Sequence, residues 1–248
     1  MRYFLHLCYD GTNYAGWQIQ PNVSTVQGEI EQALNTILRE PISIIGCGRT
    51  DKGVHATKYF AHFDCVKIED EGNFLYKLNG VLPNDIACKS IIEVDENSHA
   101  RFDASIRAYT YSLHFKKDPF NRRFSTFYPQ GYKLDEALLH QCAEDLLHRT
   151  DFSSFCKAHT DNVTNLCTIH ESKWHMDAPN GVLRYKISAN RFLRGMVRLI
   201  VGSALNVALG KISYEDYMRH IVSGTRSDKM SSAPANGLAL SNVTYPFF

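Results

Sequence analysis

Strand-like and helix-like segments are intermixed along this chain, and they occur twice in a similar order with no linker between the two halves. Periodicity in the first half predicts strands at 3–9, 42–47, 59–65 and 89–94, and helices at 24–39 and 73–80. Periodicity in the second half predicts strands at 109–115, 168–176, 182–189 and 238–245, and helices at 134–148, 193–209 and 214–223. Because hairpins join several neighbouring strands, this order favours an α+β fold over a doubly wound parallel fold. We therefore expect two similar α+β halves, residues 1–105 and 106–248.

Composition limits the class of protein. The chain has 248 residues, 44% of them hydrophobic, which is enough to bury a sizeable core. Its net charge of +1 argues against a surface coated with basic charge, but RNA affinity depends on local Lys and Arg patches. The seven cysteines lack zinc-site spacing, so we expect reduced, mostly buried thiols and no metal site.

The chain offers no clear membrane or export signal. Its most apolar stretch, 196–209, is interrupted by Arg198 and Asn206 and is shorter than the roughly 20 residues that a membrane span needs. The N-terminal residues are too broken in character for a signal peptide. These features predict a soluble, cytoplasmic protein that does not bind a membrane.

Residues 48–57 (GRTDKGVHAT) form the segment most suggestive of chemistry. They follow the apolar run Ile42–Ile45, which is typical of a buried strand, and glycines at 46, 48 and 53 allow sharp turns or close backbone approach. A single carboxylate, Asp51, lies on this turn near Arg49, which indicates a reactive site. Taken in isolation, an aspartate near glycine more often caps its own turn.

This segment resembles the signature loop of the TruA family of pseudouridine synthases. Further motifs match that family in its order and span nearly the whole chain. They are Asp10–Tyr14, Gly16–Gln18, Val26–Gln27, Leu82–Ile86, Ala100–Phe102 with Arg107–Tyr111, Asp151–Phe155, Phe192–Arg198 with Ile200–Gly202, and Ala233–Leu238. The resemblance implies two α+β halves that join largely antiparallel sheets around a central RNA-binding cleft.

The resemblance also implies an activity and roles for particular residues. The family isomerises uridine to pseudouridine in the anticodon stem-loop of tRNA, at positions 38–40, without a cofactor and as a homodimer. Asp51 would be the nucleophile, which either attacks C1′ or removes a 2′ proton to give a glycal; the sequence leaves both routes open. Four further residues would bind the substrate. They are Tyr109, which stacks on uracil; Arg198, which pairs with Asp51; Arg49, which replaces the extruded base; and Leu238.

Two groups of basic residues are candidates for binding RNA phosphates. Arg191, Arg194 and Arg198 are spaced i, i+3, i+7 and would share a helix face unless Arg191 precedes the first turn. A second group consists of Lys116, Lys117, Arg122 and Arg123. For this second group a solvated loop face is an equally good interpretation.

Less specific interpretations exist for the candidate site residues. Tyr109 fits a core-facing strand position, and Arg198 fits an arginine that extends along an apolar helix towards water. His55 could act as an acid or base, although a structural histidine is the favoured interpretation. Cys47 could be a nucleophile, although an inert buried thiol fits its apolar strand better. At Lys52 many bacterial members of the family carry alanine, so the added charge leaves the choice of RNA open.

Three other functions remain open. The chain could be a paralogous synthase that acts on another tRNA uridine, because such an enzyme would share these motifs. It could be a non-catalytic RNA-binding module, although such a module gains little from a carboxylate that faces phosphates. A hydrolase that uses Asp51 with His55 is a weaker option, and it predicts strand cleavage or base release.

Overall fold

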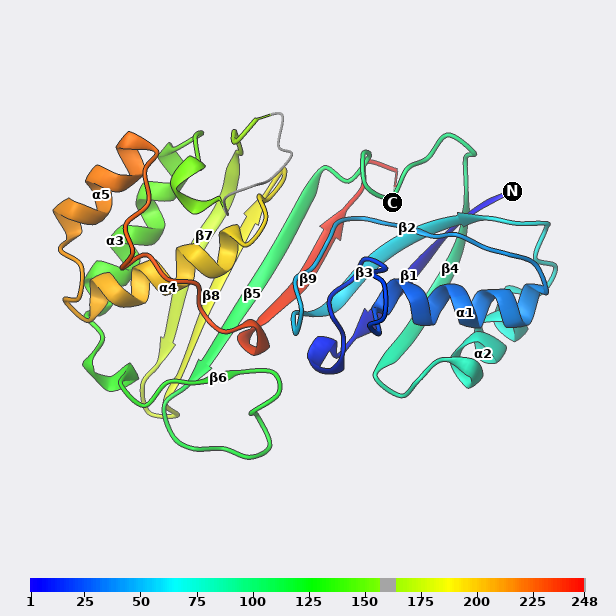
Figure 1. Cartoon of the computed structure of the whole chain (residues 1–248), viewed down its shortest axis with the longest axis horizontal. Coiled ribbons are helices and arrows are strands. Elements are labelled where there is room, and N and C mark those ends of the chain that lie inside the picture. Colours follow the sequence, from blue (N-terminus) through cyan, green and yellow to red (C-terminus); the bar gives the residue numbers. More distant parts are fainter. Residues whose placement is uncertain (157–163, 248) are drawn as a thin grey trace. The chain divides into compact units, whose positions relative to one another are not determined.

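The computed structural model describes residues 1–156 and 164–247, and it divides the chain into two compact units (Figure 1). Unit 1 comprises Met1–Ile106 and Ala239–Phe248, and unit 2 comprises Arg107–Leu238. The C-terminal strand therefore belongs with the N-terminal unit. Among the described residues, none of the helices combines the length and the apolar character needed to cross a membrane.

The sheet of unit 1 is built around β1 (Arg2–Tyr9), which pairs antiparallel with β3 (His55–Asp64) and β4 (Ile86–Val94). Two further strands pair with β3: the short β2 (Ile45–Gly46), antiparallel, and β9 (Leu238–Thr244), parallel. Strand β1 is paired along both edges, so it is an interior strand of this sheet. Five of its eight residues are buried: Tyr3, Phe4, Leu5, Leu7 and Tyr9.

Two helices complete unit 1. They are α1 (Val26–Leu38) and α2 (Glu71–Val81). Helix α1 begins at Val26, two residues later than predicted, and Thr25 caps it: the Thr25 side chain accepts a hydrogen bond from Gly28 N at 3.3 Å. Starting at Val26 places the apolar face of the helix, which includes Ile30 and Leu34, in the core, whereas Ser24 bonds to Glu29 instead.

The predicted strand at 42–47 is wrong in extent, because only Ile45 and Gly46 are paired as β2. On the edge away from β3, side chains of α1 bond to backbone donors of this segment. Asn35 accepts from Ile42 N at 2.6 Å, and Glu31 accepts from Ile44 N at 2.9 Å. Conversely, β3 begins at His55 rather than at residue 59, so the second part of the 48–57 segment is itself strand.

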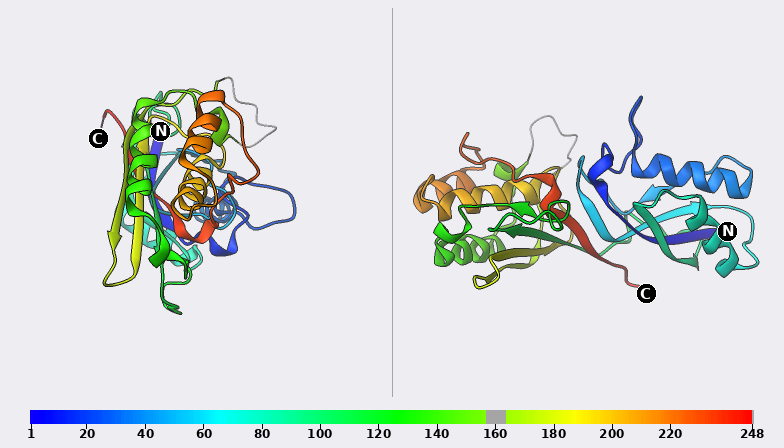
Figure 2. Two further views of the ribbon diagram at one scale, coloured as in Figure 1. Left: turned by 90° about the vertical axis from the view of Figure 1, so that its left-hand side faces the viewer. Right: turned by 90° about the horizontal axis from the view of Figure 1, so that it is seen from below.

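The sheet of unit 2 has the order β5 (Ile106–His114), β8 (Val182–Ala189), β7 (Ile169–Asp177), and both pairings are antiparallel. A two-residue strand that the sequence did not predict, β6 (Thr126–Phe127), pairs parallel with β5. The helices of this unit are α3 (Glu136–Asp145), α4 (Met196–Ala208) and α5 (Tyr214–Ser223). Figure 2 shows α4 and α5 on one side of the strands.

Mostly antiparallel strands with intermixed helices confirm the α+β prediction. The predicted start of α4 at residue 193 is wrong: Gly195 adopts a φ of 73° and the helix begins at Met196. Arg191 and Arg194 therefore precede the helix and do not share its face with Arg198. Helix α3 ends at Asp145 and continues as a 3-10 turn to residue 148.

Most cysteines are buried, as predicted. All seven are free, and four of them are buried: Cys47, Cys88, Cys142 and Cys167. Burial raises the pKa of the Cys142 thiol to about 12 and that of Cys167 to about 11. Both thiols therefore stay protonated at neutral pH and are poor nucleophiles.

Candidate active site

The segment Gly48–Gly53 connects β2 to β3 in unit 1, and the segment that follows β1 fixes its backbone. Trp17 N donates to Thr50 O at 3.2 Å, and Gly53 N donates to Tyr14 O at 3.4 Å. Within the loop, Val54 N donates to Asp51 O at 3.1 Å and closes a tight turn. Two sequence motifs that are far apart in the chain, 10–18 and 48–57, thus form one structural unit.

Gly16 explains why this approach is possible. Its φ is 109°, a backbone conformation that favours glycine, and a β-carbon added there would lie 2.5 Å from Thr50 O and 3.2 Å from Asp51 C. The backbone of Gly16 therefore rests directly against the peptide that joins Thr50 to Asp51. A side chain at this position would displace the candidate nucleophile.

His55 links the same two segments. It is 3% exposed, and its Nδ1 lies 3.0 Å from Gly11 N and 3.1 Å from Asp10 Oδ1. This one nitrogen either accepts from the Gly11 N–H or, when protonated, donates to Asp10. Asp10 also caps its own turn by accepting from Thr12 N at 3.0 Å. These contacts favour the structural interpretation of His55 over a role as acid or base.

The residues of the loop alternate between inner and outer positions. Thr50 is buried, and its hydroxyl lies 2.9 Å from the Tyr9 hydroxyl. Arg49 on one side of it is exposed and Asp51 on the other is half-buried. Cys47 is fully buried, which favours the inert thiol over a nucleophile. The side chains suited to chemistry are thus the ones within reach of a substrate.

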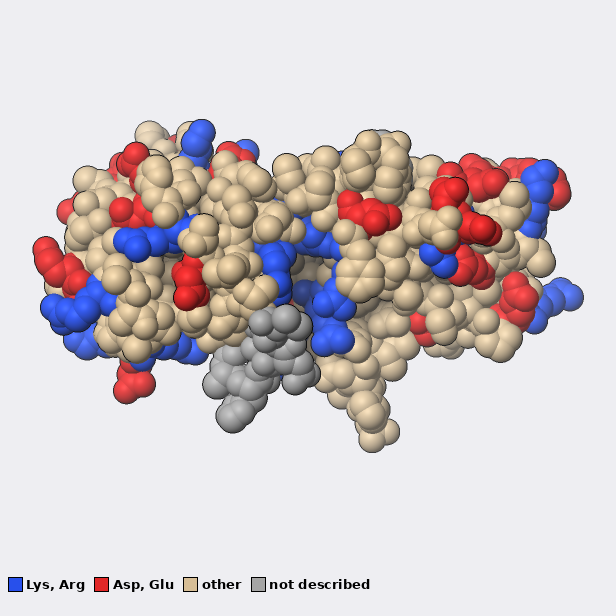
Figure 3. Space-filling view, turned by 90° about the horizontal axis from the view of Figure 1, so that it is seen from above, with Lys and Arg blue, Asp and Glu red and all other residues tan. Residues whose placement is uncertain are grey.

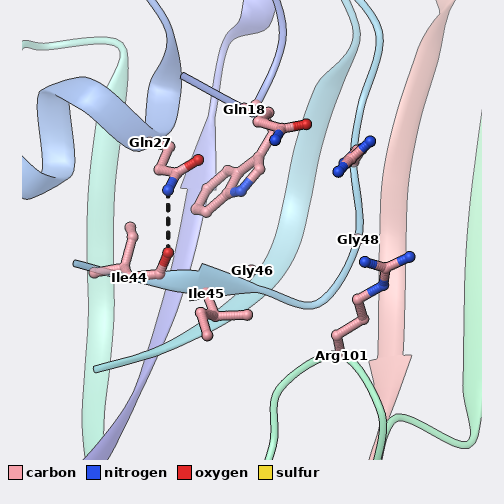
Figure 4. Close-up of a pocket in the computed structure, with 9 residues that line it drawn as sticks. Gln18, Gln27, Ile44, Ile45, Gly46, Gly48 and Arg101 are labelled. Atoms are coloured by element: carbon pink, nitrogen blue, oxygen red, sulfur yellow. Dashed lines mark hydrogen bonds between the residues drawn. The ribbon is translucent and has the colours of Figure 1, made fainter. Parts of the chain in front are cut away.

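An open pocket of about 190 Å³ lies beside this loop (Figure 4). Its lining contains the indole of Trp17, two side-chain amides and two apolar side chains, but Arg49 and Arg101 are its only charged residues. On one wall, Gln27 Nε2 donates to Ile44 O at 3.1 Å, which is the hydrogen bond drawn in Figure 4. Two guanidinium groups without an acid in the lining suit an anionic group such as a phosphate.

Arg101 is held at this pocket by the residue before it, because both backbone polar groups of the buried Ala100 are bonded to side chains. Ala100 N donates to His62 Nδ1 at 3.1 Å, and the Tyr245 hydroxyl donates to Ala100 O at 2.6 Å. Burial, with smaller effects from Arg2 and His99, lowers the pKa of His62 to about 4. His62 is therefore neutral at pH 7, as an acceptor at Nδ1 requires. We did not predict a role for Arg101, although its Ala-Arg-Phe motif was visible in the sequence.

The remaining substrate-binding candidates lie in unit 2 or at its end. Tyr109 is half-buried on β5. Its ring contacts the ring of Phe192 edge to face, with the ring centroids 5.2 Å apart. Arg198 is half-buried on α4, and its Nε donates to Ala233 O at 2.7 Å. Leu238, the first residue of β9, is 5% exposed. The chain from Ala233 to Leu238 is thus tied to the arginine that precedes it by 35 residues.

The predicted phosphate-binding residues lie in two loops of unit 2. Arg191 and Arg194 are in the loop before α4, where Arg194 is exposed and Arg191 half-buried. The other four, Lys116, Lys117, Arg122 and Arg123, are all exposed in the loop between β5 and β6.

Two exposed aromatic residues, Phe120 and Phe124, lie among the basic residues of the β5–β6 loop. Phe120 is 93% exposed, and Asn236 holds the loop by donating to Arg122 O at 3.0 Å. Aromatic faces beside cations are typical of single-stranded RNA binding. Although the sequence contained this interleaving, we predicted only the cations.

Acidic and basic side chains both occur on the face of the molecule that Figure 3 draws. On this face, Lys and Arg appear beside Asp and Glu in both units, in keeping with the net charge of +1. Among residues 1–156 and 164–247, no group of three or more His, Cys, Asp or Glu side chains is arranged to hold a metal ion.

Comparison with known proteins gives a consistent match over nearly the whole length. A family model described as tRNA pseudouridine synthase matches residues 7–103 and 143–246. A protein of Bacteroides thetaiotaomicron named tRNA pseudouridine synthase A is 45% identical over 246 residues, covering 99% of this chain and 91% of the relative.

Two other relatives carry the same name. The protein of Azobacteroides pseudotrichonymphae is 42% identical over 245 residues, covering 99% of this chain and 97% of the relative. The protein of Pseudothermotoga lettingae is 36% identical over 246 residues, covering 98% and 99%. With this identity over nearly the whole chain and a family model that matches most of it, this chain belongs to the tRNA pseudouridine synthase family, whose members are isomerases that convert uridine to pseudouridine.

Proposed function

We propose that this protein isomerises uridine to pseudouridine in the anticodon stem-loop of tRNA, at positions 38–40, with Asp51 as the nucleophile. One observation carries most of the proposal: Asp51 is half-buried on a loop whose backbone is bonded on both sides and lies against Gly16. A fixed carboxylate is what nucleophilic catalysis needs, because it keeps the reacting atoms aligned.

The reaction needs only this nucleophile and controlled proton movement. The Asp51 carboxylate attacks C1′, or removes a 2′ proton to give a glycal, while the C1′–N1 bond breaks. The base then turns and C5 bonds to C1′, while the Asp51–C1′ bond breaks or, in the glycal route, the proton returns to C2′. The proton on C5 is then lost and N1 gains one. Atoms and electrons balance without an oxidant or reductant, so the proposal includes no cofactor. Arg198 is proposed to keep Asp51 ionised by pairing with it, because an opposite charge lowers a carboxylate pKa.

The target base must leave its stack before Asp51 can reach C1′. Arg49, exposed beside the nucleophile, is proposed to fill the space that the base leaves. Tyr109 is proposed to stack on the extruded uracil, because an aromatic face is a common device for holding unstacked RNA bases. Leu238 is proposed as an apolar contact for the same base.

Binding of the rest of the RNA is proposed to use the basic groups of both units. The pocket that contains Arg49 and Arg101 suits a phosphate near the target nucleotide. The loops with Lys116, Lys117, Arg122 and Arg123, and with Arg191 and Arg194, are proposed to contact the stem. We further propose a homodimer that holds one tRNA between subunits, and a cytoplasmic location.

Release of tritium from tRNA labelled at uracil C5, measured for the wild type and Asp51→Ala, tests this proposal. Release by the wild type alone, at positions 38–40, is the expected result. Release at another uridine would identify a paralogous synthase. Binding of tRNA without release would identify a non-catalytic module, and strand cleavage or free uracil would identify a hydrolase.

A further inference from the structure

Tyr59 on β3 makes an unusual contact with the candidate catalytic loop. Its side chain is fully buried, and its hydroxyl donates a hydrogen bond to the backbone carbonyl of Gly48, the residue before Arg49. The ring stacks on Trp17, with centroids 4.1 Å apart and an interplanar angle of 27°. Tyr59 thus reaches the loop from inside the core, on the side away from solvent.

A glycine makes room for this contact. A β-carbon at Gly46 would overlap the Tyr59 hydroxyl and would lie 2.6 Å from Cε2 of Trp17. The two rings can therefore lie against the backbone of β2 only because residue 46 has no side chain. Residue 46 must be glycine because of the space that Tyr59 and Trp17 occupy. Its backbone conformation does not require glycine, since its φ lies outside the left-handed region.

The loop has a second anchor two residues further on. The Thr50 hydroxyl is 2.9 Å from the Tyr9 hydroxyl in a buried contact, and Trp17 N donates to Thr50 O. The anchored residues, 48 and 50, alternate with Arg49 and Asp51. Consequently an anchored residue immediately precedes Arg49 in the sequence, and another immediately precedes Asp51. These are the two side chains of this loop that have a role in the proposed reaction.

We propose that Tyr59 is a positioning residue for uridine isomerisation, which acts through the Gly48 carbonyl to fix the backbone that carries Arg49 and Asp51. This inference rests on the proposed function of that loop. Misplacement of a catalytic group by about 1 Å can reduce the rate on the order of 100-fold. Because Tyr59 is buried beneath the loop and most of the proposed RNA contacts lie elsewhere, its loss should reduce turnover much more than affinity for tRNA.

Tyr59→Phe removes the hydroxyl and keeps the stacked ring. Tyr3→Phe is a matched control: Tyr3 is also fully buried in unit 1, and its hydroxyl accepts from a backbone N–H, that of Ile68, at 3.0 Å. We expect Tyr59→Phe to lower kcat for pseudouridine formation about tenfold, with little change in the dissociation constant for tRNA. Tyr3→Phe should keep the wild-type kcat, and both variants should unfold cooperatively.

Hydrogen exchange of the amides in residues 48–54, followed by mass spectrometry without RNA, supplies a readout independent of activity. Exchange should accelerate in Tyr59→Phe and in Thr50→Val, which loses the second anchor, but not in Tyr3→Phe. Wild-type kcat in Tyr59→Phe, or equal losses in Tyr59→Phe and Tyr3→Phe, would overturn the inference. If the wild-type protein forms no pseudouridine, the proposed function fails. The exchange measurement then still tests whether Tyr59 holds the loop: unchanged exchange in Tyr59→Phe would reject this role, and faster exchange would support it.

Discussion

Replacing Gly16 by alanine should destabilise the protein and move the candidate nucleophile. The new β-carbon would lie 2.5 Å from Thr50 O, and the residue would have to keep a φ of 109°. The backbone conformation costs about 1–2 kcal/mol for a residue with a β-carbon, and overpacking costs about 1–3 kcal/mol. Together these give a loss of about 2–5 kcal/mol, which in a chain of this size lowers Tm by about 10 °C.

Gly80→Ala is the control for this substitution. Gly80 lies in α2, and an added β-carbon there meets no atom within 4 Å, so the change should stabilise the helix by about 0.5–1 kcal/mol. Thermal unfolding and tritium release should be measured for both variants. Gly16→Ala should lose turnover as well as stability, whereas Gly80→Ala should keep its turnover. A Tm for Gly16→Ala equal to that of the wild type would refute the argument from close backbone approach.

Three further predictions concern the other site residues. Arg198→Lys should cut turnover much more than tRNA affinity, because one ammonium cannot replace a planar guanidinium; equal losses would indicate a phosphate contact instead. Tyr109→Phe should bind tRNA almost normally, since a stacking face remains, and a severe loss of affinity would reject stacking. The lowered pKa of His62, about 4, means that the unfolded chain binds the proton more tightly, so stability should fall as pH decreases from about 6.5 to 4. His62→Asn should flatten this dependence in thermal unfolding at several pH values, and an unchanged slope would assign it to other groups.

Local patterns in the sequence predicted which elements exist better than where they begin. Residues 168–189 were predicted as a hairpin, and β7 and β8 confirm it, because alternation and the Asn-Gly turn both favour it. The predicted strand at 42–47 is shorter in the structure, and its donors at Ile42 and Ile44 bond to side chains of α1, a tertiary contact that no local pattern carries. The predicted face formed by Arg191, Arg194 and Arg198 failed because Gly195 adopts a positive φ and the helix starts after it.

The sequence points to the candidate site where motif residues offer reactive or charged side chains, as for Arg49 and Asp51, whose roles stay predictions. It does not point to residues that act by supporting them. Tyr59 occupies an ordinary position in a strand pattern, and only the structure reveals that its hydroxyl bonds to Gly48 while Gly46 leaves space for the ring. Glycines of the two motifs are therefore needed for different physical reasons: Gly46 leaves space for two buried rings, and Gly16, 34 residues before Thr50, lets the loop backbone approach. The 48–57 motif looks like a single turn in the sequence, but in the structure its backbone packs against the distant segment 10–18. Substitutions at these contacts should reduce turnover more than they reduce RNA affinity.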